Sequence, residues 1–250
     1  MTLRGPFVPE RNTALFLDVD GTLLEIAATP DEVRVPAALR NTLQLASARE
    51  GGAMALVSGR PISELDRLFS PHRFAAAGLH GFERRNAQGQ LHRPTVDTEA
   101  LTTIRNSLQG LATTHRGLLL EDKEVGLAFH YRLAPHLGPM VIEAMEHAVQ
   151  SLRHEFMLRH GKFVIELAPH GCSKRIAIEN FMREPPFEGR IPVFIGDDLT
   201  DEEGFEVVNA MNGFSILVGS TPRTAARFRF GSVSAVVSWL RERNLNLQPH

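Results

Sequence analysis

The chain has 250 residues, 43% hydrophobic and 22% charged, a composition that supports a packed core and is not typical of a disordered protein. The net charge of −2 offers no basic field for nucleic acid, and no apolar run is long enough to span a membrane. The single cysteine, Cys172, excludes an internal disulfide, and Met1–Asn12 lacks the apolar stretch of a signal peptide, so we expect a cytoplasmic protein.

A short apolar run near the amino terminus, residues 14–17, is typical of a buried strand, and two carboxylates follow it at once. Asp18 and Asp20 are separated by one residue, and Gly21 then permits a backbone conformation that other residues resist. Open α/β sheets bind ligands at the carboxyl ends of their strands. Two carboxylates this close repel each other unless a cation or a shared proton separates them, and Mg²⁺ prefers such oxygen ligands. The alternative is a strand that ends in a solvated acidic turn.

A predicted helix at residues 31–47 leads to a second apolar strand at residues 53–57. This strand runs directly into Ser58–Arg60, and Pro61 is tolerated in the first turn of the helix that follows. Ser58 therefore lies between a strand end and a helix N-terminus, a position suited to holding an anion, although a serine there is often only a helix cap. Residues 74–77 predict a third strand.

The pattern changes after residue 81, where short paired strands and two helices replace the alternation of strands and helices. Helices packed on one face of an antiparallel sheet are the expected arrangement for such a segment. The predicted elements are a strand–turn–strand unit from residue 82, a helix at 98–115, a hairpin at 118–122 and 126–131, a helix at 136–153, and a hairpin at 156–159 and 163–168.

The alternation resumes near residue 170, where Lys174 begins a predicted helix. An apolar strand at residues 191–195 then ends in an acidic turn that contains Asp197, Asp198 and Asp201. A helix at 202–211, a strand at 214–218 and a helix at 233–243 complete the pattern. We therefore expect an α/β fold with a doubly wound parallel sheet, formed by residues 1–81 and 170–250, into which residues 82–169 are inserted as an α+β cap domain.

Four groups of polar side chains occupy equivalent places in this predicted core. Asp18 and Asp20, Ser58, and the acidic turn follow apolar strands, and Lys174 begins a helix. In a parallel sheet the carboxyl ends of the strands share one edge, so these groups are expected to converge. A carboxylate nucleophile, hydroxyl and ammonium donors and oxygen ligands for a cation suit phosphoryl transfer, in which positioning and charge neutralisation dominate.

These motifs resemble those of the haloacid-dehalogenase superfamily of phosphatases, and the segment between Ser58 and Lys174 resembles the type 2 cap of that superfamily. The resemblance extends over nearly the whole chain to the bacterial trehalose-6-phosphate phosphatases. The segments that carry it are Leu17–Leu23, Ser58–Arg60, Gly78–Arg85, His130–Arg132, Gly161–Lys162 and Gly196–Glu202.

The resemblance implies a reaction through an aspartyl-phosphate. Asp18 would attack the phosphorus, and Asp20 would protonate the departing sugar oxygen and then deprotonate the attacking water. Ser58 and Lys174 would bind the phosphate oxygens. The implied cofactor is Mg²⁺, held by Asp18, the backbone carbonyl of Asp20, and Asp197. Asp198 and Asp201 could be metal ligands through water or could merely orient Lys174, and Asp198 is the additional candidate metal ligand of the two.

The cap is expected to select the sugar. By strand alternation, Glu121 and Lys123 share one face of their strand, and the alternative for charged residues on hairpins is a merely solvated sheet face. With the resemblance, we favour substrate binding. The expected substrate-binding residues are Thr22, Gly59, Arg60, His80, Gly81, Glu121, Lys123, Arg132, Lys162 and Glu166. Three of these have an open alternative: Thr22 could orient Asp18 or Asp20, Arg60 could pair with the acidic turn, and Lys162 could only occupy a turn.

The function expected from the resemblance is Mg²⁺-dependent hydrolysis of trehalose 6-phosphate, the last step of trehalose synthesis. One alternative is a capped phosphatase for another sugar phosphate, such as sucrose 6-phosphate or a mannosyl phosphate. A phospho-accepting signalling module is a further alternative, but such modules are about half this length and have no use for a cap. A non-catalytic binding module is disfavoured by the complete set of motifs. The expected partner is a small sugar phosphate, without nucleic acid or membrane, and a monomer is expected.

Overall fold

The computed structural model describes residues 9, 12–26, 33–94, 98–123, 125–161, 163–221 and 223–245. The chain divides into two compact units. One unit, the core, comprises Met1–Arg93 and Ser173–His250, and the other, the cap, comprises Pro94–Cys172. No helix in the described part of the chain combines the length and the apolar character needed to cross a bilayer.

The core contains an eight-stranded sheet with the strand order β12-β11-β10-β1-β2-β3-β4-β5. The first six of these strands pair in parallel, and β4 and β5 complete the sheet by antiparallel pairing. The strands are β1 (Thr13–Leu17), β2 (Met54–Val57), β3 (Ala75–Gly78), β4 (Glu83–Arg85), β5 (Leu91–His92), β10 (Ile191–Gly196), β11 (Phe214–Val218) and β12 (Phe228–Phe230).

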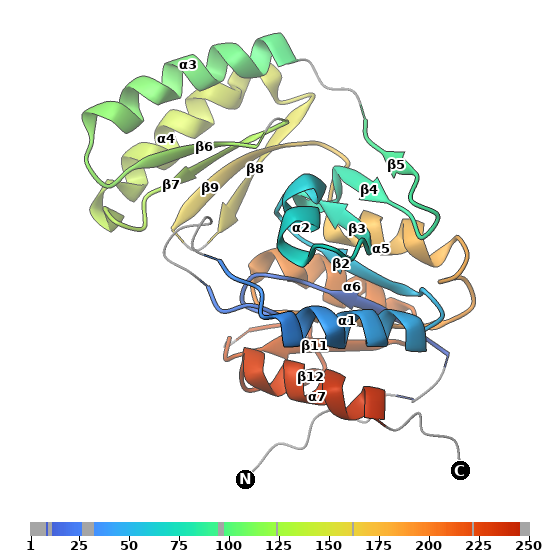
Figure 1. The fold of residues 1–250 in the computed structure, drawn as a ribbon. Coiled ribbons are helices and arrows are strands. Elements are labelled where there is room, and N and C mark those ends of the chain that lie inside the picture. The colour runs from blue at the N-terminus through green and yellow to red at the C-terminus, as the bar shows by residue number, and fades with distance from the viewer. Residues whose placement is uncertain are drawn as a thin grey trace. The chain divides into compact units, whose positions relative to one another are not determined.

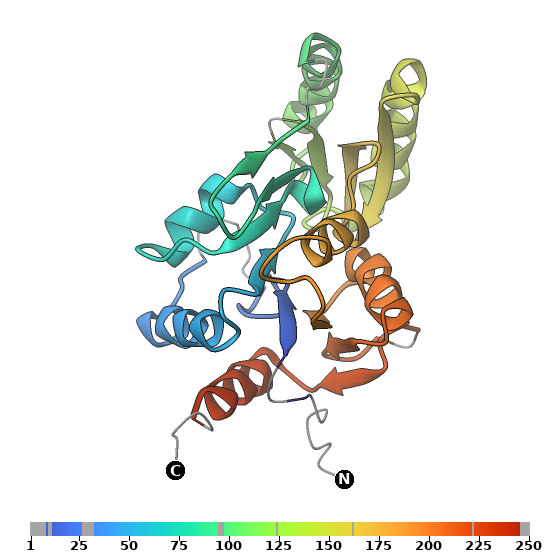
Figure 2. The ribbon, with the colours of Figure 1, turned by 90° about the vertical axis from the view of Figure 1, so that its right-hand side faces the viewer.

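Helices cover both faces of this sheet, as Figure 2 shows for α1 and α7 on one side and α5 and α6 on the other. The alternation of side chains along β1 explains why both faces are apolar. Leu15 and Leu17 are buried with α1, α2 and α7, and Ala14 and Phe16 are buried with α5 and α6. The helices are α1 (Ala37–Arg49), α2 (Ile62–Phe69), α5 (Lys174–Met182), α6 (Glu202–Ala210) and α7 (Val233–Leu245), with short 3₁₀ turns η2 (Leu79–Gly81) and η5 (Leu199–Asp201).

The cap is an antiparallel four-stranded sheet, in the order β6-β7-β9-β8, with α3 and α4 packed on one face (Figure 1). Its own apolar core joins Leu101 and Leu108 of α3 to Phe129 and Ile165 of the sheet. The elements are α3 (Thr98–Thr114), β6 (Leu119–Asp122), β7 (Leu127–His130), η3 (Pro135–Leu137), α4 (Gly138–Val149), η4 (Gln150–Leu152), β8 (Phe156–Gly161) and β9 (Val164–Pro169).

The predicted fold class is confirmed, and so are the two hairpins and two helices of the insert. The division between the units differs from the expected one, because it falls after Arg93 and Cys172 instead of after Gly81 and Pro169. The reason is that β4 and β5 extend the core sheet, with Glu83 opposite Gly78 of β3. The strand β12 was not predicted.

Candidate active site

The register of the parallel sheet brings the predicted motifs to one edge. Leu17 at the end of β1 lies opposite Ile195 of β10 on one side and Leu56 of β2 on the other. The Asp18 N–H donates to the Ile195 carbonyl at 2.9 Å, which continues this alignment past the end of the strand. The residues that follow β1, β2 and β10 therefore emerge side by side, as the sequence predicted.

The turn after β1 places its backbone directly against the acidic turn after β10. Gly21 has a φ of 84°, and its N–H donates to the Leu24 carbonyl at 2.7 Å. A Cβ atom at Gly21 would lie 2.1 Å from Oδ2 of Asp197. Glycine is required here for two reasons, the left-handed backbone and the close approach of a carboxylate.

Lys174 lies between two buried carboxylates. Its Nζ donates to Oδ1 of Asp18 at 2.8 Å and to Oδ1 of Asp201 at 2.5 Å. Ser173 caps the helix by accepting from the Ile176 N–H, so the first residue of α5 is held in place. Burial alone would lower the pKa of Lys174, but the neighbouring carboxylates raise it well above its ordinary value. The ammonium group is therefore a fixed positive charge at the sheet edge.

Carboxylate oxygens of Asp18, Asp197 and Asp201 lie within 4.8 Å of one another, the one such group of potential metal ligands in the described ranges. Burial raises the pKa of Asp18 well above its ordinary value, although Lys174 opposes the shift. Burial and the charges of Asp201 and Asp198 raise the pKa of Asp197 to about 7. The cluster carries more negative charge than Lys174 can balance, which is the electrostatic condition for binding a cation.

The oxygen donors of this cluster fit Mg²⁺, which prefers a few carboxylates supplemented by water and substrate oxygens. Asp201 is already engaged, because its Oδ2 accepts from the N–H groups of Asp197 and Asp198 and its Oδ1 accepts from Lys174. Asp18 and Asp197 are thus the carboxylates best suited to hold the ion. Gly21 preserves the space in which Asp197 reaches the turn after β1.

Asp198, an expected metal ligand, lies outside this cluster of oxygens. Its Oδ1 accepts from the N–H and the hydroxyl of Thr200, at 2.8 and 2.7 Å, and the side chain caps η5. Burial alone would raise the pKa of Asp198, but Lys174 and the Thr200 hydrogen bonds hold it below its ordinary value. Asp201 occupies the third place in the cluster, and it also orients Lys174, one of the two roles that the sequence left open.

The loop after β2 presents Ser58 and Arg60 at the same edge. The Ser58 hydroxyl accepts from the Arg60 N–H at 3.1 Å, whereas α2 is preceded by Pro61 with no side-chain cap, so Ser58 is not the cap of that helix. Arg60 forms two hydrogen bonds to Asp20, at 2.6 and 2.8 Å. Gly59 allows the His80 ring to approach, since a Cβ there would lie 2.7 Å from its Nε2.

The remaining expected core residues are buried around this loop. His80 is 9% exposed, and its N–H donates to the Ser58 carbonyl at 3.0 Å, with a left-handed φ of 56°. Gly81 is required for the close approach of the Ser173 carbonyl, which would lie 2.5 Å from an added Cβ. The buried Thr22 hydroxyl has no hydrogen-bond partner among the described residues, so it orients neither Asp18 nor Asp20 by such a bond.

The cap sheet has a polar face opposite its helices, formed by side chains of β6, β7, β8 and β9. In the register of the sheet, Ala128 lies opposite both Glu121 and Glu166, and Arg159 lies opposite Glu166. Strand alternation therefore places these residues in one row on one face. Asp122, the next residue along β6, points to the other face, where it pairs with Arg105 of α3 at 2.7 Å.

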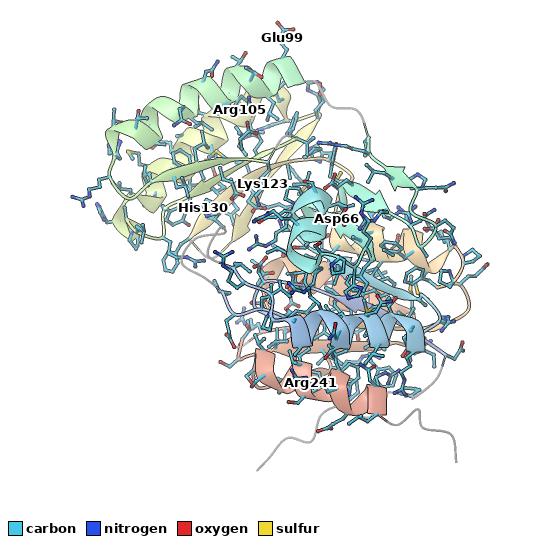
Figure 3. The ribbon with its side chains drawn as sticks, in the orientation of Figure 1. Asp66, Glu99, Arg105, Lys123, His130 and Arg241 are labelled. Atoms are coloured by element: carbon cyan, nitrogen blue, oxygen red, sulfur yellow. The ribbon has the colours of Figure 1, made fainter. Side chains whose placement is uncertain are left out.

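One ion pair and one hydrogen bond to a carboxylate organise this polar face of the cap sheet, and Figure 3 labels one residue of each, Lys123 and His130. Lys123 Nζ lies 2.8 Å from Glu166, and His130 Nε2 lies 2.8 Å from Glu121. Burial alone would raise the pKa of Glu121, but His130 and Lys123 hold it below its ordinary value. Arg132 is exposed just beyond β7, and Lys162 lies outside the described residues.

Sequence reasoning missed two participants in these contacts. His130 belongs to His130–Arg132, one of the segments that carry the family resemblance. Only the register of β6 and β7 shows that its side chain reaches Glu121. Glu64 of α2 accepts from the Arg60 guanidinium. Its signal in the sequence was its position four residues after Arg60, which is the spacing of neighbours on a helix.

A doubly wound core with an inserted α+β cap, and with aspartate, serine, lysine and acidic-turn motifs at one sheet edge, is the fold of solved phosphatases of the haloacid-dehalogenase superfamily. A phosphatase of that superfamily from Bacteroides thetaiotaomicron shares the fold with a TM-score of 0.62 and 16% identity, covering 98% of this chain and 100% of the other. The C-terminal domain of Candida albicans trehalose-6-phosphate phosphatase gives a TM-score of 0.82 with 19% identity, covering 96% and 94%.

The sequence profile of the trehalose-phosphatase family matches residues 16–234. The trehalose-6-phosphate phosphatase of Escherichia coli is 43% identical over 227 residues, which cover 91% of this chain and 85% of the relative. The chain therefore belongs to the trehalose-phosphatase family.

Proposed function

We propose that this protein hydrolyses trehalose 6-phosphate to trehalose and inorganic phosphate in the final step of trehalose synthesis. The observation that carries the proposal is the contact of Lys174 with Asp18 at the end of β1, in a chain that belongs to the trehalose-phosphatase family. A buried carboxylate beside a fixed ammonium group and a cation-binding cluster can accept a phosphoryl group.

The proposed reaction has two steps. Asp18 attacks the phosphorus, the bond from phosphorus to the sugar oxygen breaks, and Asp20 gives that oxygen a proton. Asp20 then takes a proton from water as the water attacks the aspartyl-phosphate, which releases phosphate and restores Asp18. Lys174 and Ser58 bind the phosphate oxygens and oppose their charge in both steps.

The proposed cofactor is Mg²⁺, which Asp18, Asp197 and the backbone carbonyl of Asp20 would hold. When bound, the ion would supply positive charge that offsets the charge of the phosphoryl group. Asp201 and Asp198 contribute indirectly, the first by orienting Lys174 and the second by capping the turn that carries Asp197.

The cap residues are proposed to bind the sugar. The polar face of the cap sheet carries polar groups that are already oriented by the Lys123–Glu166 ion pair and the His130–Glu121 hydrogen bond, so they can form directed hydrogen bonds with hydroxyl groups. Glu121, Lys123 and Glu166 are the main candidates, and Arg132 and Lys162 are further candidates from the sequence. Thr22, Gly59, His80 and Gly81 are proposed to line the phosphate end of the substrate. A cytoplasmic location and a monomeric state stay predictions from the sequence.

The test is inorganic phosphate release from a panel of esters, with Mg²⁺ and with a chelator. We expect strong preference for trehalose 6-phosphate over sucrose 6-phosphate and glucose 6-phosphate, and loss of release with the chelator. The Asp18→Asn variant should release no phosphate while it unfolds at a temperature no lower than that of the wild type, because burial disfavours the charge that it removes.

Each part of the proposal would be contradicted by a different result of these assays. Equal rates on all esters would contradict the role of the cap but not the phosphatase activity. Preference for sucrose 6-phosphate would replace the proposed substrate. Release by Asp18→Asn at the wild-type rate would exclude Asp18 as the nucleophile.

A further inference from the structure

The backbone around Arg60 is fixed on both sides. The Arg60 N–H donates to the Ser58 hydroxyl at 3.1 Å, and the Arg60 carbonyl accepts from the Leu79 N–H at 3.1 Å. Two residues later, the Ile62 N–H at the start of α2 donates to the buried carboxylate of Glu83 at 2.5 Å. The side chain of Arg60 therefore extends from a backbone that has little freedom to move.

The guanidinium of Arg60 bridges two carboxylates. Nε donates to Oδ2 of Asp20 at 2.6 Å and Nη2 donates to Oδ1 at 2.8 Å, which is the bidentate arrangement that fixes the plane of a carboxylate. On its other edge, Nη1 donates to Glu64 in the first turn of α2. The Arg60 side chain is 11% exposed, whereas the Asp20 side chain is 33% exposed.

We propose that Glu64 and Arg60 are positioning residues that aim the carboxylate of Asp20 at the oxygen of the leaving group. This set of contacts is called here the Asp20 clamp. The proposal rests on the proposed function, in which Asp20 exchanges protons with the sugar oxygen and with water. Asp20 itself lies between β1 and the turn at residues 21–23 and is partly exposed, so the clamp supplies the orientation that burial does not provide.

A role in binding the phosphate end of the substrate is the alternative for Arg60, for which the sequence predicted either substrate binding or pairing with the acidic turn. Three of its five N–H bonds already point to carboxylates. The two roles predict different dependence on the leaving group. A phosphate-binding arginine stabilises every phosphate ester alike, whereas a residue that aims the proton donor matters most when the leaving oxygen needs a proton.

The decisive variant is Arg60→Lys, which keeps the positive charge but cannot form the bidentate pair. Its kcat/KM is measured on trehalose 6-phosphate and on an activated aryl phosphate that the wild-type enzyme turns over. For the sugar ester we expect a loss of about 100-fold, the lower end of what acid–base catalysis contributes, and for the aryl ester a loss below about fivefold. The ratio of the two losses is the readout, because kcat/KM covers the steps through cleavage of the ester.

Glu64→Gln provides a second variant that leaves Arg60 and Asp20 unchanged. It removes the charge at the far edge of the guanidinium, and we expect the same selective loss for the sugar ester at about tenfold. The matched control is Arg85→Lys. Arg85 forms an equivalent bidentate pair with Asp66 on the same helix, labelled in Figure 3, at 2.7 Å for both bonds, and it does not contact Asp20.

The outcomes separate the proposal from its alternatives. Selective loss in both variants, with the wild-type ratio retained in Arg85→Lys, supports the Asp20 clamp. Equal losses on the two esters assign Arg60 to phosphate binding or to the stability of the loop and overturn the clamp, and so does unchanged activity of Arg60→Lys. A wild-type enzyme without activity on trehalose 6-phosphate would instead contradict the proposed function.

Discussion

The pKa of Asp197 shows the excess of negative charge in the site most directly. Asp197 lies beside Asp18 and Asp201, and the ammonium group of Lys174 is already hydrogen-bonded to those two carboxylates. Burial, followed by the charges of Asp201 and Asp198, raises the pKa of Asp197 to about 7. Without a bound cation, the folded protein therefore holds a proton that the unfolded chain would release at neutral pH.

This shift predicts how the stability of the metal-free protein depends on pH. A carboxyl whose pKa is higher in the folded state stabilises the fold at low pH, and that contribution is lost as the pH rises from the ordinary value of 3.8 to about 7. The raised pKa values of Asp18 and Asp201 act in the same direction. In the presence of a chelator, the unfolding temperature should fall between pH 5 and pH 8, measured by calorimetry.

Asp197→Asn and added Mg²⁺ provide the controls for this prediction. The variant should show a weaker fall, because asparagine has no proton to release. Mg²⁺ should stabilise the wild type more at pH 8 than at pH 5, because it binds the ionised carboxylates. An unfolding temperature that rises over this pH interval without metal would contradict the assignment.

At the scale of the elements, apolar runs were sufficient to predict the strands that build the site. β1, β2 and β10 are short, apolar apart from Thr13 at the start of β1, and followed at once by polar residues, so both their position and their shared edge could be derived from the sequence. The strands β4, β5 and β12 have at most three residues, which is too short for a periodic pattern. The membership of β4 and β5 in the core sheet depends on pairing with β3, which local sequence does not encode.

The contacts of side chains were the least predictable part of the site. The sequence placed Asp20 and Arg60 near one edge, but their pairing spans 40 residues and depends on the conformation of two turns. Likewise, capping by Asp198 and lysine binding by Asp201 could not be distinguished in a run of acidic residues. The element that decides between them is η5, whose backbone directs each carboxylate differently.

The turn after β1 yields a prediction at this scale. Gly21→Ala should abolish most phosphate release, by about 100-fold or more, because the new Cβ would lie 2.1 Å from Asp197 Oδ2 and displace a residue of the cation cluster. It should also cost about 1–2 kcal/mol of stability for the left-handed backbone, measured by denaturant unfolding.

Gly89 is a matched control for this substitution. It has the same φ of 84°, but nothing lies within 4 Å of an added Cβ. Gly89→Ala should therefore lose similar stability and keep its activity. If the two variants were equally active, the close packing of Gly21 against Asp197 would have no catalytic importance.

At the scale of the whole molecule, the two units have separate apolar cores. Most of the buried apolar residues in the described part of the chain fall into two clusters on the faces of the core sheet and one cluster in the cap. The groups proposed for phosphoryl transfer belong to the core unit, and the charged groups proposed for sugar recognition belong to the cap unit. This separation permits the sugar specificity to change without change in the phosphoryl chemistry.

The separation predicts that cap variants discriminate between substrates. Lys123→Ala and Glu166→Ala each remove one partner of a half-buried ion pair on the polar face of the cap sheet. We expect kcat/KM for trehalose 6-phosphate to fall by about 100-fold, because the sugar hydroxyls lose the side chains proposed to bind them. Turnover of a small aryl phosphate, which has no sugar hydroxyls, should change little.

Arg105→Gln is the control for this last prediction, since it breaks an ion pair between α3 and Asp122 on the opposite face of the same sheet. It perturbs the cap without touching the polar face, so its activity on both substrates should remain near that of the wild type. Equal losses on both substrates in the Lys123 and Glu166 variants would mean that these residues only maintain the fold of the cap. Selective loss for trehalose 6-phosphate would show instead that the cap unit, which has its own apolar core, determines substrate specificity. This is the arrangement expected when substrate recognition and phosphoryl chemistry are carried by separate domains.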